Sequence, residues 1–441
     1  MARAARSSAL TVLGFGSSQL IRLASNLILT RLLFPEAFGM MALVSVLLMG
    51  LMQFSDVGVT PAILQSKRGD DEAFLNTAWT IQVMRGITLW LVACALAWPL
   101  AWFYDEGALA QLLPVAALTL VITGFNPTRL DSANRHLMFG RVTAIDIATQ
   151  LVGIIAAVTL AYLTHSVWSL VWSGIISALA GLILMNLFLP GIRNRFRWEK
   201  PAAAELISFG KWIFMSTVCG FLFAQGDKII IGKYLPLDLF GVYNIGFFLA
   251  SFPLMLGGMV TRRLLIPIYR ELPPKESREN FLKLRRMRFV VTTGLLGLTL
   301  LLAVTGVWLV QIMYDERYQA AGAVVVMIAV MQIPQMIVMT YDQAALAAGD
   351  SKRFFVLTVA KATAMIGCLL VGLEMAGLIG ALISIGVAMI FIYPVVVWLA
   401  RQMGAWDPWH DMLTALAGFV IAALSIWVSW DAIQTLSTLG S

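Results

Sequence analysis

Residues 8–39 read SALTVLGFGSSQLIRLASNLILTRLLFPEAFG, an apolar segment long enough to cross a bilayer, followed by a short turn. Polar side chains recur along it at helical spacing and form one stripe of an otherwise apolar helix: Thr11, Gln19, Arg22, Asn26 and Thr30. Arg22 stands near the middle of the segment, where an arginine costs at least ~2.5 kcal/mol on insertion scales. The sequence therefore predicts that Arg22 faces protein, water or ligand rather than lipid.

The composition is that of a polytopic membrane protein. Of the 441 residues, 60% are hydrophobic and 12% are charged, whereas a soluble domain is about 45–50% apolar and about 25% charged. Arg3 and Arg6 precede the first apolar run as in a signal peptide, but no small-x-small cleavage site follows, so we expect an uncleaved first span. The three cysteines form no disulfide or metal-binding pattern, and we expect no metal and no cofactor.

Thirteen apolar segments are long enough to span the membrane. Their approximate bounds are 8–33, 37–64, 73–103, 109–125, 142–164, 167–190, 209–234, 238–266, 287–313, 321–341, 355–373, 376–400 and 411–433. With the N-terminus in the cytoplasm, the inner loops receive 25 of the 31 basic residues, which agrees with the positive-inside rule. The net charge of +7 is thus explained by topology, and no nucleic-acid partner is expected. The basic loops at 191–211 and 262–288 are expected to contact membrane lipids.

Two halves of the sequence repeat each other. The pattern from Arg31 to Gly39 recurs from Lys233 to Gly241, and Tyr104-Asp-Glu recurs at Tyr314. Because the repeats run in the same orientation with six spans each, they follow a known transporter plan. The predicted fold is an all-α polytopic membrane protein with two pseudo-symmetric six-helix bundles and an extra C-terminal helix. The predicted parts are an N-terminal lobe (1–190), a basic cytoplasmic linker (191–208), a C-terminal lobe (209–401) and the extra helix (402–441).

Deep polar residues are the candidate substrate-binding groups. A guanidinium suits phosphate oxygens, and amides suit sugar hydroxyls. The candidates are Arg22, Gln19 and Asn26 on the first segment, Arg85 and Gln82 on the third, and Lys211, Gln225 and Lys228 on the seventh. Two alternatives stay open: Arg22 pairs with Asp56 on the return helix as a structural ion pair, and Arg85 snorkels to the inner interface.

Four charged residues within spans are candidates for ion or proton coupling, because a membrane carboxylate can bind a cation or a proton. They are Asp56, Asp146, Asp227 and Lys361. The alternative for each is a structural pair with a neighbouring basic residue, and Asp146 and Lys361, at matching depths in the two lobes, are also candidates to pair with each other. The proline residues Pro114, Pro253, Pro334 and Pro394 are candidates for kinks in their spans, and the glycines from Gly377 to Gly386 are interpreted as packing sites.

Enzyme signatures are missing from the sequence. The three histidines have no zinc-protease spacing, and there is neither a Walker motif nor a GxSxG motif. The sequence therefore predicts a protein that is not an enzyme and does not use ATP directly.

The stretch from Asn26 to Gly39, the sequence FSDVGVTPAILQ at 54–65, and the later motifs FGKW (209–212), QGDK (225–228) and LFGVYN (239–244) together resemble bacterial polysaccharide exporters. These are the O-antigen and exopolysaccharide flippases of the multidrug/oligosaccharidyl-lipid/polysaccharide superfamily. The resemblance implies two bundles around a central cationic cavity, with Arg22 at the position of the first-helix cavity cation.

By the same resemblance, the function is to move polyprenyl-pyrophosphate-linked oligosaccharide from the cytoplasmic to the periplasmic leaflet by alternating access, for lipopolysaccharide or exopolysaccharide synthesis. The site of action is then the bacterial cytoplasmic (inner) membrane, and the partners are the lipid-linked oligosaccharide, a polysaccharide polymerase and a chain-length regulator. Two other classes remain open: a cation-coupled drug exporter of the same superfamily, and a membrane saccharide polymerase or ligase. The deep basic residues disfavour the first, and the short outer turns disfavour the second.

Overall fold

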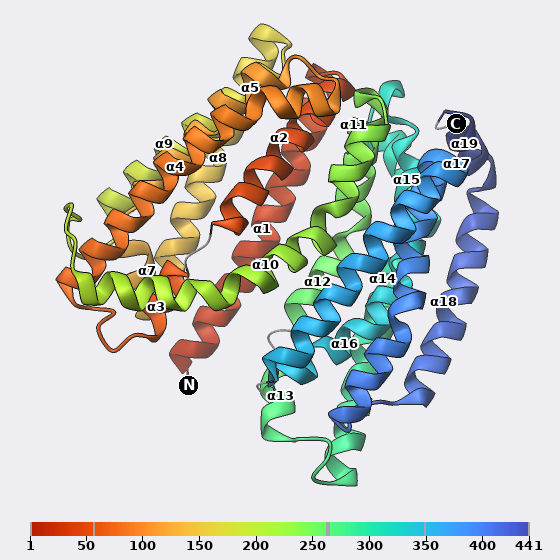
Figure 1. The fold of residues 1–441 in the computed structure, drawn as a ribbon. Coiled ribbons are helices and arrows are strands. Elements are labelled where there is room, and N and C mark those ends of the chain that lie inside the picture. The colour runs from red at the N-terminus through yellow and green to blue at the C-terminus, as the bar shows by residue number, and fades with distance from the viewer. Residues whose placement is uncertain (1, 56–57, 262–264, 348–349, 440–441) are drawn as a thin grey trace. The chain divides into compact units, whose positions relative to one another are not determined.

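The computed structural model describes residues 2–55, 58–261, 265–347 and 350–439. Within these ranges, the side chains of residues 2–13, 15, 207–216, 343, 346–347 and 351 lie outside the description. All regular structure in the described ranges is helical (Figure 1). This confirms the predicted all-α class.

The chain divides into two compact units, residues 1–218 and 219–441, and the division falls inside helix α10. The helices of the first unit are α1 (Ala2–Leu32), α2 (Pro35–Phe54), α3 (Val59–Gln65), α4 (Glu72–Tyr104), α5 (Leu109–Ala116), α6 (Leu118–Gly124), α7 (Arg129–Arg135), α8 (Phe139–Thr164), α9 (Trp168–Phe188) and the first part of α10 (Lys200–Tyr234). The second unit continues with α11 (Leu237–Ala250), α12 (Phe252–Val260), α13 (Ile266–Glu271), α14 (Arg278–Met313), the short 3-10 helix η2 (Glu316–Tyr318), α15 (Ala321–Met331), α16 (Ile333–Ala347), α17 (Ser351–Gln402), α18 (Pro408–Val428) and α19 (Trp430–Leu439).

Seven of the described helices are each long and apolar enough to cross a membrane, and three bent helix pairs pass the same test together. The chain is therefore a multi-pass membrane protein. Apart from 8–33, which falls on α1, and 209–234, which falls on α10, each predicted segment overlaps one of these helices or bent pairs, and α17 carries two of them.

The sequence repeats mark corresponding turns of the two units. The motif beginning at Arg31 forms the turn from α1 to α2, and its copy at Lys233 forms the turn from α10 to α11. Tyr104 ends α4 and Tyr314 follows α14, and both side chains are buried. Equivalent motifs thus occupy equivalent places in two helical series.

Several spans are broken, and the breaks only partly follow the predicted kinks. Pro253 and Pro334 stand in the first turns of α12 and α16, each directly after a break with a bend of 43°. In contrast, α17 runs on through Pro394. Gly377 was interpreted as a packing residue, but it is a turn residue: with φ +53° and ψ −135° it separates the two spans within α17. A side chain would be strained in that conformation.

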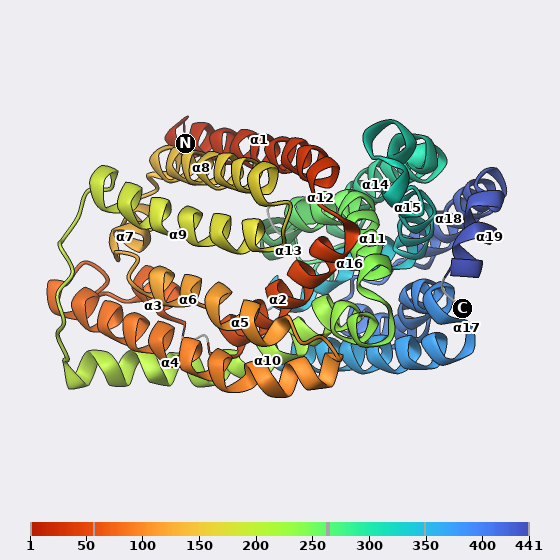
Figure 2. The same ribbon diagram turned by 90° about the horizontal axis from the view of Figure 1, so that it is seen from above.

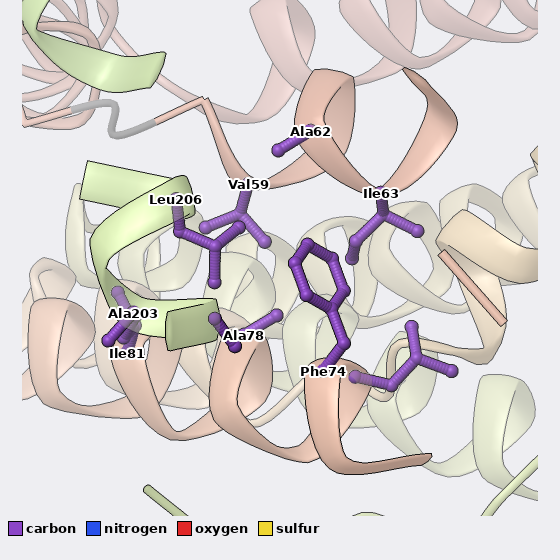
Figure 3. Packing of buried hydrophobic residues seen from close by; sticks show 10 residues of the cluster. Val59, Ala62, Ile63, Phe74, Ala78, Ile81, Ala203 and Leu206 are labelled. Carbon is purple, nitrogen blue, oxygen red and sulfur yellow. The ribbon is translucent and has the colours of Figure 1, made fainter. Parts of the chain in front are cut away.

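One end of the first unit has its own apolar core. Side chains of α3, the start of α4 and the start of α10 meet there (Figure 3). Phe74 and Ile63 are fully buried in it, and Leu206 packs against them from α10. The core fixes the first turns of α10 to the first unit.

The segment between α9 and α10 is extended and fastened to α4. Its backbone N–H groups donate to buried side chains: Arg195 to Asn76 Oδ1 at 2.9 Å, Arg197 to Thr80 Oγ1 at 3.0 Å and Glu199 to Thr77 Oγ1 at 3.1 Å. Arg68, just before α4, also pairs with Glu199 at 2.9 Å. The predicted linker 191–208 is therefore an extended strap held against α4 up to Glu199, and from Lys200 on it is the start of helix α10.

Carboxylates cap the first turns of α4 and α17, and this predicts acid sensitivity. Asp71 accepts from the N–H of Ala73, and Asp350 accepts from the N–H of Arg353. The Arg68 side chain holds the pKa of Asp71 below its ordinary value, and the Arg353 N–H does the same for the pKa of Asp350. Because folding lowers the pKa of both carboxyl groups, each ionised carboxylate stabilises the folded protein above about pH 4. This stabilisation is lost as the pH falls through the lowered pKa.

We therefore expect the unfolding temperature to decrease when the pH is lowered below about 4. The measurement is tryptophan fluorescence during heating in detergent, at pH values between about 3 and 7. The variant with Asp71→Asn and Asp350→Asn keeps two good N-cap residues and should lose less stability over the same interval. An equal acid loss in the variant would contradict this account.

Candidate functional site

A polar cavity of about 450 Å³ lies among α1, α8 and α9 in the first unit. Figure 2 shows α1 beside α8 and α8 beside α9. The lining residues are Ser18, Arg22, Ser25, Asn26, Asp146, Thr149, Gln150, Ile154, Ser177 and Met185. Eight of these ten carry polar or charged side chains, although α8 and α9 are long and apolar enough to cross a membrane.

Close contacts between α1 and α8 position the cavity. A Cβ on Gly14 would come within 2.2 Å of the Thr143 side chain, so only glycine allows this approach. Further along, Ser18 Oγ donates to Gln150 Oε1 at 2.7 Å, and Gln150 Nε2 donates to the Ser18 carbonyl at 3.0 Å. This reciprocal pair closes one side of the cavity and aligns Arg22 and Asn26, one and two helical turns on, with its interior.

Arg22 and Asp146 line the same cavity from opposite helices. Both residues are exposed, and both contribute to the lining of this cavity. Arg22 thus faces a polar space, as the sequence predicts.

The cavity holds an unused hydrogen-bonding group. Thr149 Oγ1 is buried and has no hydrogen-bond partner within the described part of the chain. Next to it, Ser177 Oγ donates to the Thr149 carbonyl at 3.3 Å. A buried hydroxyl without a partner is costly, and Thr149 Oγ1 can reach a ligand hydroxyl or water only when its side chain turns toward the cavity.

The chemistry of this lining suits an anion that carries hydroxyl groups. Arginine presents a planar fork of donors that matches phosphate oxygens. The amides of Asn26 and Gln150 and the hydroxyls of Ser25 and Thr149 both donate and accept, as sugar hydroxyls require. Asp146 adds one carboxylate, which can bind a proton or a cation.

The residues predicted on the third segment have protein partners. Arg85 Nε donates to Ser55 Oγ at 2.9 Å, and its Nη2 donates to the Met52 carbonyl at the end of α2. Gln82 Nε2 donates to the Thr123 carbonyl at 3.3 Å. Both therefore tie α4 to its neighbours, and neither lines the cavity of Arg22. Gln19, on α1, is half-buried and is not among the lining residues of that cavity.

In the second unit the charged candidates also form specific contacts. Lys228 Nζ donates to Gln225 Oε1 at 2.9 Å and lies 4.7 Å from the centre of the Phe247 ring. Asp227 is buried and accepts from the Tyr243 hydroxyl.

Lys361 forms a buried ion pair with Asp342 of α16, with Nζ and Oδ2 2.6 Å apart. This is a structural ion pair, and its acidic partner, Asp342, was not predicted from the sequence. Two candidates are not placed: Asp56 lies outside the described residues, and so does the side chain of Lys211.

The neutral part of the cavity lining was not predicted from the sequence. Ser18, Ser25, Thr149, Gln150 and Ser177 were not singled out, because small hydroxyl residues are common in membrane helices, where they also satisfy backbone carbonyls. The usable signal was their spacing. Ser18, Arg22 and Ser25 share one helix face, as do Asp146, Thr149 and Gln150.

The fold and cavity define a polytopic helical membrane protein with a transporter fold. The chain is similar to the lipid II flippase MurJ in its inward closed conformation, with TM-score 0.72, 12% identity and 98% of each chain covered. It is also similar to an inward-facing multidrug resistance MATE family transporter of the MOP superfamily, with TM-score 0.61, 14% identity, and 88% of this chain and 95% of that chain covered.

Residues 28–325 match the family described as polysaccharide biosynthesis protein, and the chain belongs to this family. Curated relatives include the teichuronic acid biosynthesis protein TuaB of Bacillus subtilis, 21% identical over 68% of this chain and 62% of its own length. The succinoglycan biosynthesis transport protein ExoT of Rhizobium meliloti is 26% identical over 61% of this chain and 54% of its own length. The lipopolysaccharide biosynthesis protein WzxC of Escherichia coli is 21% identical over 80% of this chain and 72% of its own length. The first two matches thus cover less than two thirds of those relatives.

Proposed function

We propose that this protein is a flippase that moves a polyprenyl-pyrophosphate-linked oligosaccharide across the membrane by alternating access, for surface polysaccharide synthesis. The observation that carries the proposal is Arg22 in a polar cavity within the membrane part of a polysaccharide biosynthesis protein. In this proposal Arg22 pairs with the pyrophosphate, and Asn26, Gln150 and Thr149 contact the first sugars. The polyprenyl chain stays in the lipid.

The cation-coupled drug exporter is the less favoured function. A cavity for cationic drugs needs an excess of carboxylates, whereas this lining has one arginine and one aspartate among neutral donors and acceptors. The names of TuaB, ExoT and WzxC refer to the synthesis or transport of polysaccharides, which also argues against drug export. A polymerase or ligase activity has no support in these names, and in our proposal the protein is not an enzyme.

The proposal includes an orientation and an energy source. The N-terminus lies in the cytoplasm and the protein resides in the bacterial cytoplasmic (inner) membrane, as the distribution of basic residues indicates. The lobes 1–190 and 209–401 then act as the two moving parts. An ion gradient or the membrane potential, worth about 2.3 kcal/mol per charge per 100 mV, drives transport, with Asp146 as the coupling carboxylate of the first lobe. A polysaccharide polymerase and a chain-length regulator act on the exported product.

Reconstitution tests the proposal. Proteoliposomes that contain the full chain and a fluorescent polyprenyl-pyrophosphate oligosaccharide are expected to expose the lipid to an impermeant quencher faster than empty vesicles do. Ethidium efflux from the same vesicles should stay at the background rate. Rapid dye efflux without lipid flipping would replace the proposed function by drug export.

A further inference from the structure

A second cavity, of about 650 Å³, lies in the second unit between α18, the latter half of α17 and the α15–α16 pair. Two of its lining residues have polar side chains, Tyr393 and Asp411, and the others are apolar or glycine. Its size and its apolar walls with few polar groups are those of a site for a small apolar ligand.

The sequence of α18 explains why the space is hollow. Asp411, Ala415, Gly418 and Ala422 follow each other at intervals of four, three and four residues, which places them on one face of the helix. At Gly418 the helix touches α16, since a Cβ there would come within 2.5 Å of Ile333 Cγ2. On either side of this contact the alanines are too short to fill the gap.

The cavity opens toward the lipid. Its rim includes Ile390 on α17 and Met412 and Phe419 on α18, whose side chains are 64%, 55% and 71% exposed. Because α17 and α18 are membrane-spanning helices, large apolar side chains exposed on their surface face the hydrocarbon core.

One end of the cavity is polar but already satisfied. The Tyr393 hydroxyl donates to Asp411 Oδ2 at 2.9 Å, and the Tyr341 hydroxyl donates to Asp411 Oδ1 at 2.6 Å. No polar atom of a ligand is therefore needed inside the cavity, and the part of the ligand within it is a hydrocarbon chain.

A cation stands just beyond that polar end. Arg401 follows Tyr393 on α17 by eight residues, or about 12 Å along the helix axis. Its side chain is exposed and its guanidinium lies 4.0 Å from the centre of the Trp406 ring. No ion pair joins it to a carboxylate among the residues that the structure describes. A guanidinium in this setting binds phosphate well.

We propose that the cavity binds one acyl chain of a phospholipid from the cytoplasmic leaflet, and that the phosphate of this lipid pairs with Arg401. From Asp411 to Ala422 the helix advances by eleven residue steps, about 16 Å. An acyl chain crosses one leaflet, which is half of the ~30 Å hydrocarbon core. A chain of that length fills the cavity, and the glycerol region spans the distance from Tyr393 to Arg401. A polyprenyl chain is the competing occupant.

Native mass spectrometry of the full chain, with phosphatidylglycerol as the added probe, tests the site. The wild-type protein is expected to retain one phosphatidylglycerol. Ala415→Trp fills the cavity and should abolish retention, and Ala422→Trp does the same from the other end. The matched control is Ala417→Trp, which lies about 200° around the helix from Ala415 and should retain the lipid.

Arg401→Ala removes one charge-assisted contact and should weaken retention about tenfold. Each variant is first checked for a single peak in size-exclusion chromatography, and Ala422→Trp carries the test where Ala415→Trp does not fold. Wild-type retention in the folded filling variants would overturn the proposal. Displacement of phosphatidylglycerol from the wild-type protein by an equal concentration of polyprenyl phosphate would overturn it as well.

Discussion

Replacing Arg22 by alanine is expected to lower the rate of lipid-linked oligosaccharide export at least about a hundredfold. Among the described residues, Arg22 is the one cation in the lining of the cavity between α1, α8 and α9. In a membrane interior the phosphate charge has few alternative partners. Loss of a bidentate, charge-assisted contact worth about 3 kcal/mol corresponds to a factor of about a hundred. The measurement is the initial flipping rate in proteoliposomes, normalised to folded protein.

Two further variants separate charge from geometry. Arg22→Lys keeps the positive charge but loses the planar fork, so it should retain an intermediate rate, roughly a tenth of that of the wild-type protein. Arg193→Ala removes an exposed arginine from the strap between α9 and α10 and should flip at the normal rate. An Arg22→Ala protein that is folded and exports as fast as the Arg193→Ala control would exclude Arg22 from the substrate site.

The sequence predicted how deep each charged residue lies in its span, but it predicted only in part which neighbours the side chain contacts. Arg22 and Asp146 were singled out because they interrupt apolar spans, and both line the cavity. Arg85 was singled out for the same reason, yet it bonds to Ser55 and the Met52 carbonyl. Hydropathy gives the position of a residue along the membrane normal. Which neighbour it meets depends on helix rotation and packing, which a single sequence does not specify.

The fold class and the order of the helices were predictable, whereas the breaks inside spans were not. Charge asymmetry and segment length fix topology strongly. The bend at Gln332 and the turn at Gly377 depend on tertiary packing, since backbone groups freed at a break must be satisfied by neighbouring helices. Lys361 meets Asp342 only because α16 continues past such a break. This explains why the acidic partner of Lys361 was not foreseen.

Replacing Asp411 by alanine is expected to destabilise the second unit by about 3–5 kcal/mol. Asp411 is buried at the start of α18 and accepts from the hydroxyls of Tyr341 and Tyr393. His410 Nδ1 lies 3.0 Å from its Oδ1, and His410 Nε2 lies 3.1 Å from Thr292 Oγ1 on α14. With the Nδ1–H tautomer this is a continuous chain of hydrogen bonds. Alanine would leave buried donors on α16, α17 and α18 without their acceptor.

The measurement is the unfolding temperature in detergent, read by tryptophan fluorescence. Asp411→Asn keeps an acceptor oxygen and should cost about 1–2 kcal/mol. The matched control is Asp431→Ala, an exposed carboxylate on α19, which should change stability by less than about 0.5 kcal/mol. Helix α18 is not one of the six spans of either repeat. Its position therefore depends on specific contacts with α14, α16 and α17, such as those of Asp411. The neighbouring Asp407, bound to Arg285 through both carboxylate oxygens, is a second link to α14. If Asp411→Ala unfolded at the temperature of the Asp431→Ala control, apolar packing alone would hold α18 in place.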